Sequence, residues 1–133
     1  MSERESLAKW RFEKAESCLR AAKLLFGTQD CHNAANRLYY CVFHCISSIF
    51  ALDGVDFKRH SAVIAHFRQN YIKTGILSTQ LSDIIGRLFT IRTESDYGDF
   101  FTISENDTAD QVENAEFFLN HIKTFLINQG LPL

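Results

Sequence analysis

Hydrophobic positions recur along most of the chain at steps of three and four residues, which is the spacing of a helix with one buried face. Val- and Thr-rich segments with strict hydrophobic–polar alternation, the pattern of a half-buried strand, are missing from the sequence. The predicted helices cover about residues 6–26, 30–52, 58–73, 79–95 and 108–129. Because short connections join long helices, we expect an all-α fold, an antiparallel up-and-down bundle of about five helices.

Local signals support several of these helix ends. Gly27 and Gly75 follow the first and third helices, and Gly54 follows the second, as glycines commonly do at helix C-termini. Thr108 followed by Gln111 has the spacing of a capping box, which predicts that the last helix begins there.

The length of 133 residues fits one domain, residues 1–133, with one hydrophobic core. No apolar stretch approaches the roughly 18 residues of a membrane span, and the charged N-terminus lacks the apolar segment of a secretory signal. We therefore expect a cytoplasmic protein that does not enter a membrane. Cys41, His44 and Cys45 are conceivable zinc ligands, but their spacing is not a tight metal motif. Ordinary packing is the preferred interpretation, with no metal and no cofactor.

Charge is unevenly distributed along the chain, although the net charge is only −2. Residues 1–92 contain thirteen Lys or Arg against eight Asp or Glu, whereas residues 93–133 contain one Lys against eight acids. This polarity is compatible with a basic groove on one face or with pairing to a second subunit.

A helical wheel of the second helix separates an apolar arc from an ordered line of polar side chains. This polar seam follows steps of four, three, four and four residues: Asn33, Arg37, Tyr40, His44 and Ser48. An ordinary solvated face is one interpretation. The seam contains no Lys, Glu or Asp, however, and Tyr and Phe flank it, so a half-buried position at a groove or subunit contact is an equal alternative.

The fourth predicted helix has a charged residue on its apolar side. Arg92 falls in the middle of that side, directly below Ile85 and Leu88, and a buried guanidinium needs partners. Asp96 lies one turn further on, at the spacing of a helical ion pair. The pair is either a structural contact that fixes the helix end or part of a site that needs a desolvated charge.

Three basic residues open the third predicted helix: Lys58, Arg59 and His60. Cations in the first turn oppose the helix dipole, so they contribute little to stability there. An anionic partner is a better explanation for this cluster.

Three stretches together carry a family resemblance. They are AANRLYYCVFHC, KRHSAVIAHFRQNYIKTG, and IRTESDYGDF followed by an acidic turn and ENAEFFLNHI. Their order and spacing resemble the HEPN superfamily, and in particular its small stand-alone prokaryotic members. The resemblance implies a bundle of about five helices that forms a homodimer. It also implies a minimal nucleotidyltransferase encoded next door, as a partner in a toxin–antitoxin pair.

The resemblance further implies a metal-independent ribonuclease whose motif is Arg, four to six residues, then His. Here Tyr97 stands at a position, counted from Arg92, where an active member has His, so it is uncertain whether this chain is an enzyme. Arg37 and His44 satisfy the same spacing, but on the second helix. If the chain cleaves RNA, we expect His44 to act as acid and base and Arg37 or Arg92 to hold the phosphate.

Two functions follow from this resemblance. The first is a dimer that binds RNA or a nucleotide in a cleft between subunits, as a toxin-type metal-independent ribonuclease or a degenerate relative. The alternative is a non-catalytic helical module that partners a nucleotidyltransferase, which the missing His and the acidic C-terminal third favour. The residues expected to bind ligand or brace the site are Asp96, Tyr97, Tyr40, His60, Lys58 and Arg59. A third interpretation is that the Arg92–Asp96 pair and the polar seam of Arg37 only stabilise a bundle whose function lies elsewhere.

Overall fold

The computed structural model describes residues 1–99 and 101–133. Its elements are α1 (Glu3–Gly27), α2 (Cys31–Asp53), α3 (His60–Phe67), the π-helical segment η1 (Arg68–Ile72), α4 (Thr79–Tyr97) and α5 (Glu105–Asn128). The described residues contain no strand and no helix apolar enough to cross a membrane. The predicted all-α class with five helices is confirmed.

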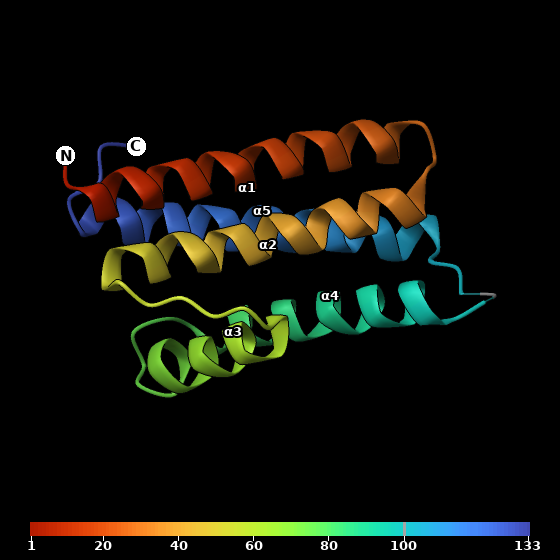
Figure 1. The fold of residues 1–133 in the computed structure, drawn as a ribbon. Coiled ribbons are helices and arrows are strands. Elements are labelled where there is room, and N and C mark those ends of the chain that lie inside the picture. Colours follow the sequence, from red (N-terminus) through yellow and green to blue (C-terminus); the bar gives the residue numbers. More distant parts are fainter. Residues whose placement is uncertain (100) are drawn as a thin grey trace.

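The four long helices run alternately up and down, and the short α3 lies at one end, below α2 and beside the start of α4 (Figure 1). Both termini lie at the same end of the bundle (Figure 1). The second helix, α2, is central because it contacts α1, α3, α4 and α5. Its place in the middle explains the long apolar run of its sequence.

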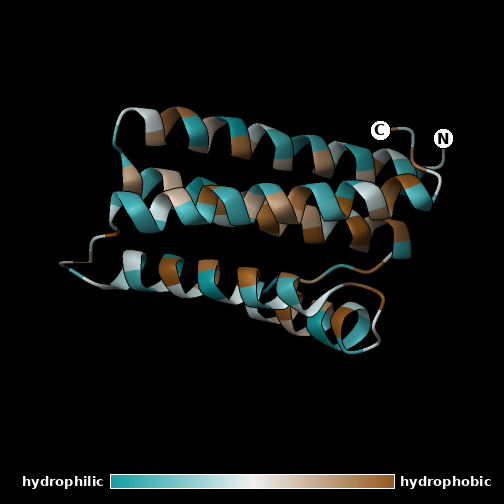
Figure 2. Ribbon diagram, turned by 180° about the vertical axis from the view of Figure 1, so that it is seen from behind, coloured by the Kyte–Doolittle hydropathy of each residue, from teal (hydrophilic) through white to brown (hydrophobic). Residues whose placement is uncertain are grey.

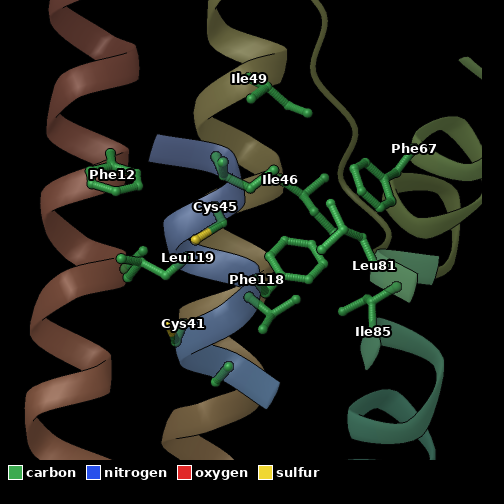
Figure 3. Close-up of a cluster of buried hydrophobic side chains, with 14 of the residues drawn as sticks. Phe12, Cys41, Cys45, Ile46, Ile49, Phe67, Leu81, Ile85, Phe118 and Leu119 are labelled. Carbon is green, nitrogen blue, oxygen red and sulfur yellow. The ribbon is translucent and has the colours of Figure 1, made fainter. Parts of the chain in front are cut away.

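The core lies where α1, α2, α4 and α5 meet. Hydrophobic and hydrophilic segments alternate along each helix, as expected for helices that bury one face (Figure 2). Phe118 of α5 is fully buried and lies among Leu81 and Ile85 of α4 (Figure 3). Cys41 and Cys45 pack in the same core as free thiols. No group of three His, Cys, Asp or Glu in the described parts of the chain is placed to hold a metal ion.

The third helix begins later than predicted. It starts at His60, and Arg59 precedes it in an extended conformation without a side-chain cap. Lys and Arg side chains cannot accept a hydrogen bond from the free N–H groups of a first turn, and their charge opposes the dipole. The placement of Lys58 and Arg59 in the first helical turn is therefore wrong, because both lie on the exposed segment before it.

The last helix begins earlier than predicted, at Glu105. Ser104 is its N-cap and accepts a hydrogen bond of 3.0 Å from the backbone N–H of Asp107. Thr108 lies inside the first turn, where its hydroxyl donates to the Ser104 carbonyl at 2.8 Å. The capping box predicted at Thr108 is therefore wrong: serine and two acids in the first turn start the helix one turn sooner. The predicted loop over 97–107 includes residue 100, which lies outside the described residues.

Candidate functional site

Three helices bring their polar side chains together around the guanidinium of Arg92. Nη1 of Arg92, on α4, lies 3.2 Å from Nδ1 of His60 on α3. Its Cζ atom lies 5.1 Å from the ring centroid of Tyr39 and 5.6 Å from that of Tyr40, both on α2. At these distances the two rings attract the guanidinium through cation–π interactions. We call Arg92, His60, Tyr39 and Tyr40 the Arg92 cluster.

Hydrogen bonding in the cluster defines the protonation of His60. The Tyr39 hydroxyl lies 2.8 Å from the same Nδ1 that faces Arg92. Arginine has only N–H donors, so Nδ1 must accept, and the Tyr39 hydroxyl then also donates to it. We therefore assign the proton of the neutral imidazole to Nε2.

The surroundings keep both partners of this hydrogen bond neutral. Burial, and after it the positive charge of Arg92, lowers the pKa of His60. Burial raises the pKa of Tyr39 to about 12, and Arg92 only partly opposes this. The guanidinium is thus next to two uncharged groups, which accept or donate hydrogen bonds but do not neutralise its charge.

Asp96 is the carboxylate that faces Arg92, and the contact is loose. Asp96 Oδ2 lies 3.7 Å from Nε of Arg92, which is longer than a hydrogen bond. That Nε is buried and has no hydrogen-bond partner among the described residues. An exposed i,i+4 pair contributes only about 0.3–0.5 kcal/mol. Desolvating an ion costs several times as much, so helix stabilisation alone does not explain Arg92.

The Arg92 cluster is open on one side. A quarter of the Arg92 side chain is exposed, and Asp96 is 44% exposed. The imidazole of His60 is also half-buried, with one face stacked on Phe43 at 4.2 Å between ring centroids. A ligand can therefore reach the edge of the cluster without unfolding the bundle.

The polar seam of α2 reaches this cluster through Tyr40. The Cζ atom of Arg37 lies 5.1 Å from the Tyr40 ring centroid, so Tyr40 contacts both arginines. The Arg37 guanidinium donates to Asn36 Oδ1 at 3.0 Å. At the other end of the seam, Ser48 is completely buried and donates to the Cys45 carbonyl at 2.6 Å. Arg37 and Tyr40 of the seam are thus half-buried at the surface, whereas Ser48 belongs to the core.

His44 lies beside the cluster but does not join its hydrogen bonds. Its ring packs against Tyr40 and Phe43, with centroids 6.1 and 6.0 Å away. Burial, followed by the positive charges of Lys14 and Arg37, lowers the pKa of His44 to about 4. The imidazole is neutral at pH 7, but it is a weak base there.

The remaining predicted site residues lie apart from this cluster. Lys58 and Arg59 are exposed on the segment that leads into α3, next to His60 in the chain. Tyr97, the last residue of α4, is 85% exposed. Five residues along a helix correspond to a rotation of about 140°, which turns Tyr97 away from the side that carries Arg92.

Sequence reasoning missed part of the site. Tyr39 is not among the predicted site residues, but it is completely buried and anchors His60. The sequence contains one sign of this role, because the hydroxyl of a buried tyrosine needs a hydrogen-bond partner. Phe43 stacks on His60, and Phe89 of α4 lies 6.1 Å from the Tyr39 ring. The His32 ring lies 2.8 Å from the Ser95 hydroxyl, and this contact connects α2 to α4.

A separate hollow of about 510 Å³ lies between α4 and α5. Its lining includes Gln80, Asp83, Arg87, Glu113 and Phe117. The two carboxylates there are unsuited to an anionic ligand, and no histidine lines the hollow. We therefore place the candidate site at the Arg92 cluster.

Comparison with known proteins assigns the chain to a family. Residues 8–125 match the HEPN domain, so the chain belongs to the HEPN domain family, as the sequence predicted. A protein of Thermotoga maritima named "UPF0332 protein" is 33% identical over 126 residues, which cover 95% of this chain and 96% of that protein. A protein of Methanocaldococcus jannaschii named "Putative toxin MJ0142" is 29% identical over 119 residues, covering 90% and 81% of the two chains.

Proposed function

We propose that the chain is a toxin-type HEPN protein that binds RNA or a nucleotide in a cleft between two identical subunits, with Arg92 as the ligand of a phosphate group. The observation that carries the proposal is the state of Arg92: a guanidinium held by two aromatic rings and a neutral imidazole, partly exposed, with an unbonded Nε. The toxin-type part rests on the name of the relative from Methanocaldococcus jannaschii.

A nucleotide needs a cation for its phosphate and flat surfaces for its base. Arginine suits the phosphate because its planar fork of N–H groups matches two phosphate oxygens. Tyr40 of the cluster and the neighbouring Phe43 are both half-buried and provide aromatic faces, on which unpaired bases stack at about 1–3 kcal/mol each. Arg37 and Lys14, which lie close to His44, add positive charge along the same surface.

The homodimer is part of the same proposal. One subunit leaves the edge of the Arg92 cluster open, and a second copy would close it into a cleft.

The first experiment compares two arginines of α4. Binding of a fluorescently labelled single-stranded RNA is measured by anisotropy for the native protein, Arg92→Gln and Arg87→Gln. Both variants lose one charge from the same helix, but Arg87 is exposed outside the cluster. We expect Arg92→Gln to weaken binding at least tenfold, since a hydrogen bond to a charged group contributes about 1.5–3 kcal/mol. Equal affinities for the two variants would refute the assignment of Arg92.

Cleavage is tested with the same proteins in a metal-free RNA-degradation assay. Degradation by the native dimer that is lost in Arg92→Gln would establish a ribonuclease. Binding without degradation by either protein would establish an RNA-binding member that does not cleave.

A second function, that of a non-catalytic partner of a nucleotidyltransferase, is favoured by the acidic surface of α5. Four exposed carboxylates follow one another along its first half: Glu105, Asp107, Asp110 and Glu113. Such a surface steers association with a basic protein. Co-purification tests this function, and it fails if no nucleotidyltransferase is encoded beside the gene and none is retained by the tagged protein.

A further inference from the structure

The structure places an imidazole beside Arg92 although the sequence after Arg92 offers none. His60 lies 32 positions earlier in the chain, on a different helix, yet its Nδ1 is 3.2 Å from Nη1 of Arg92. We propose that His60 is the proton-transfer residue of the Arg92 site and that a phosphate group bound by Arg92 frees its imidazole for this role. The inference rests on the proposed function.

In the structure the imidazole of His60 has no free lone pair. Nδ1 accepts from both Arg92 and Tyr39, and Nε2 carries the proton. An imidazole in this state cannot take a proton from a substrate hydroxyl. Contact with Arg92 therefore keeps His60 inactive as a base while the site is empty.

A phosphate group changes this balance because it is a stronger partner for Arg92. Hydrogen bonds between two charged groups are roughly twice as strong as those that involve only neutral groups, and a phosphate accepts two N–H groups at once. Once Arg92 turns to the phosphate, Nδ1 of His60 keeps only Tyr39 as its partner. A phenol hydroxyl both donates and accepts, so Tyr39 also satisfies the tautomer with the proton on Nδ1. Nε2 then presents a free lone pair.

The same event raises the basicity of His60. Arg92 is the charge that lowers the pKa of His60 after burial, and a bound phosphate offsets that charge. The titratable and charged groups around the imidazole come from two helices and the segment before α3: Tyr39, Tyr40, His44, Arg92, Asp96, Lys58 and Arg59. Asp96 pairs with Arg92, so the charge of Arg92 is the part of this environment that a phosphate changes most.

With RNA as the ligand, the step balances as follows. Nε2 of His60 takes the proton of a ribose 2′-hydroxyl, and the 2′-oxygen forms a bond to the adjacent phosphorus while Arg92 holds the phosphate oxygens. The bond from phosphorus to the 5′-oxygen breaks, and that oxygen takes a proton from water. The products are a 2′,3′-cyclic phosphate and a 5′-hydroxyl, and His60 returns its proton to solvent.

His44 is the competing candidate, because it lies at a ribonuclease-like spacing from Arg37. No described residue connects the His44 ring to Arg92 by a hydrogen bond, whereas His60 and Arg92 are in direct contact. The rings of Tyr40 and Phe43 pack against both histidines, so the direct contact with Arg92 is what distinguishes His60.

The test is nuclear magnetic resonance of protein with ¹⁵N-labelled histidine rings, without and with a 2′-O-methyl single-stranded oligonucleotide, which binds but cannot be cleaved. In the free protein we expect His60 with an unprotonated Nδ1 and a protonated Nε2. On binding, we expect the proton to move to Nδ1 and the pKa of His60 to rise, while His44 keeps its tautomer. His60→Gln assigns the signals.

Two outcomes separate this inference from the proposed function. If anisotropy shows no binding of the oligonucleotide, the proposed function is refuted, and this inference is refuted too because it rests on that function. If the oligonucleotide binds while His60 keeps its tautomer and pKa, or if the tautomer of His44 changes instead, only the role of His60 is refuted.

Kinetics provides the second readout. Glutamine at position 60 still accepts hydrogen bonds from Arg92 and Tyr39, so His60→Gln is expected to fold and to bind RNA within about threefold of the native protein. Its cleavage rate should fall at least 100-fold, the usual contribution of a general base. His66→Gln, on the same helix but outside the cluster, is the control that retains the rate. Native cleavage by His60→Gln, or binding without cleavage by the native protein, would overturn the proton-transfer role.

Discussion

The second helix takes part in two regions of opposite character. Toward α1 and α5 its side chains are fully buried and apolar, with Ile46 and Cys45 packed near Phe118 (Figure 3). Toward α3 and α4 it presents rings with polar tips, Tyr39 and Tyr40, against a cation. In the first region, no buried side-chain nitrogen or oxygen of the described residues lacks a hydrogen-bond partner. The second leaves a buried Nε without a hydrogen bond, a feature that stability does not explain.

The largest effect is expected in the core. Phe118→Ala removes a fully buried ring and leaves a cavity, so the free energy of unfolding should fall by about 3–5 kcal/mol. Urea denaturation followed by circular dichroism measures it. The affinity of the folded fraction for RNA should be unchanged, because Phe118 lies outside the Arg92 cluster. A loss below 1 kcal/mol would show that the core is not packed around this ring.

A pH dependence distinguishes the site from the core. The folded-state pKa of His44 is lowered to about 4, and that of His60 is also lowered, so the unfolded chain binds more protons below pH 6.5. The contribution of these two neutral imidazoles to the free energy of unfolding should therefore be fully present above about pH 7 and be lost as pH falls from there to about 4. Solvent screening reduces the part due to His44 to about 1–2 kcal/mol. His44→Gln should flatten the profile between pH 4 and 7, and an unchanged profile would contradict the lowered pKa.

A smaller effect is expected where the two regions meet. Tyr39→Phe retains the buried ring but removes the hydroxyl that donates to His60 Nδ1. We expect a loss of about 0.5–1.5 kcal/mol in the free energy of unfolding, since one hydrogen bond disappears and Arg92 still satisfies the imidazole. Thermal unfolding of the two proteins at pH 7 provides the comparison. A loss above 3 kcal/mol would mean that the hydroxyl stabilises the fold through more than its hydrogen bond to His60.

The two regions also differ in how far the sequence predicts them. Periodicity predicted the helices of the core because each depends on its own local pattern, and Gly54 does end α2, in a left-handed conformation. The start of α5 was missed because the pattern offered two caps, and Ser104 lies one turn before Thr108. At the N-terminus the capping box that forms is Ser2 with Glu5. Local signals thus identify which segments are helical more reliably than they identify the first residue of each helix.

Several residues of the site were predicted from the sequence, but the contacts that join them were not. Arg92 could be identified because a charge on an apolar face violates the pattern of its own helix. Its partnership with His60 could not, since the two are 32 positions apart and meet only when α3 and α4 are folded. For the same reason Ser48 was expected in a polar seam, although the packing of α2 in the centre of the bundle buries it completely.

The smallest change in stability is expected at Arg92 itself. Methionine fills a similar volume without a charge, and replacing a poorly satisfied buried ion by an apolar side chain is often neutral or stabilising. Arg92→Met should therefore change the free energy of unfolding by less than about 1 kcal/mol in urea titrations at pH 7. A loss above 3 kcal/mol would identify Arg92 as a structural residue, like those of the core.

The affinity of Arg92→Met for single-stranded RNA, measured by anisotropy beside the native protein in the same buffer, decides whether Arg92 holds the phosphate. If Arg92 is the phosphate ligand, this variant retains its stability and loses at least tenfold in affinity. Native affinity in a folded Arg92→Met protein would show that Arg92 does not bind the phosphate.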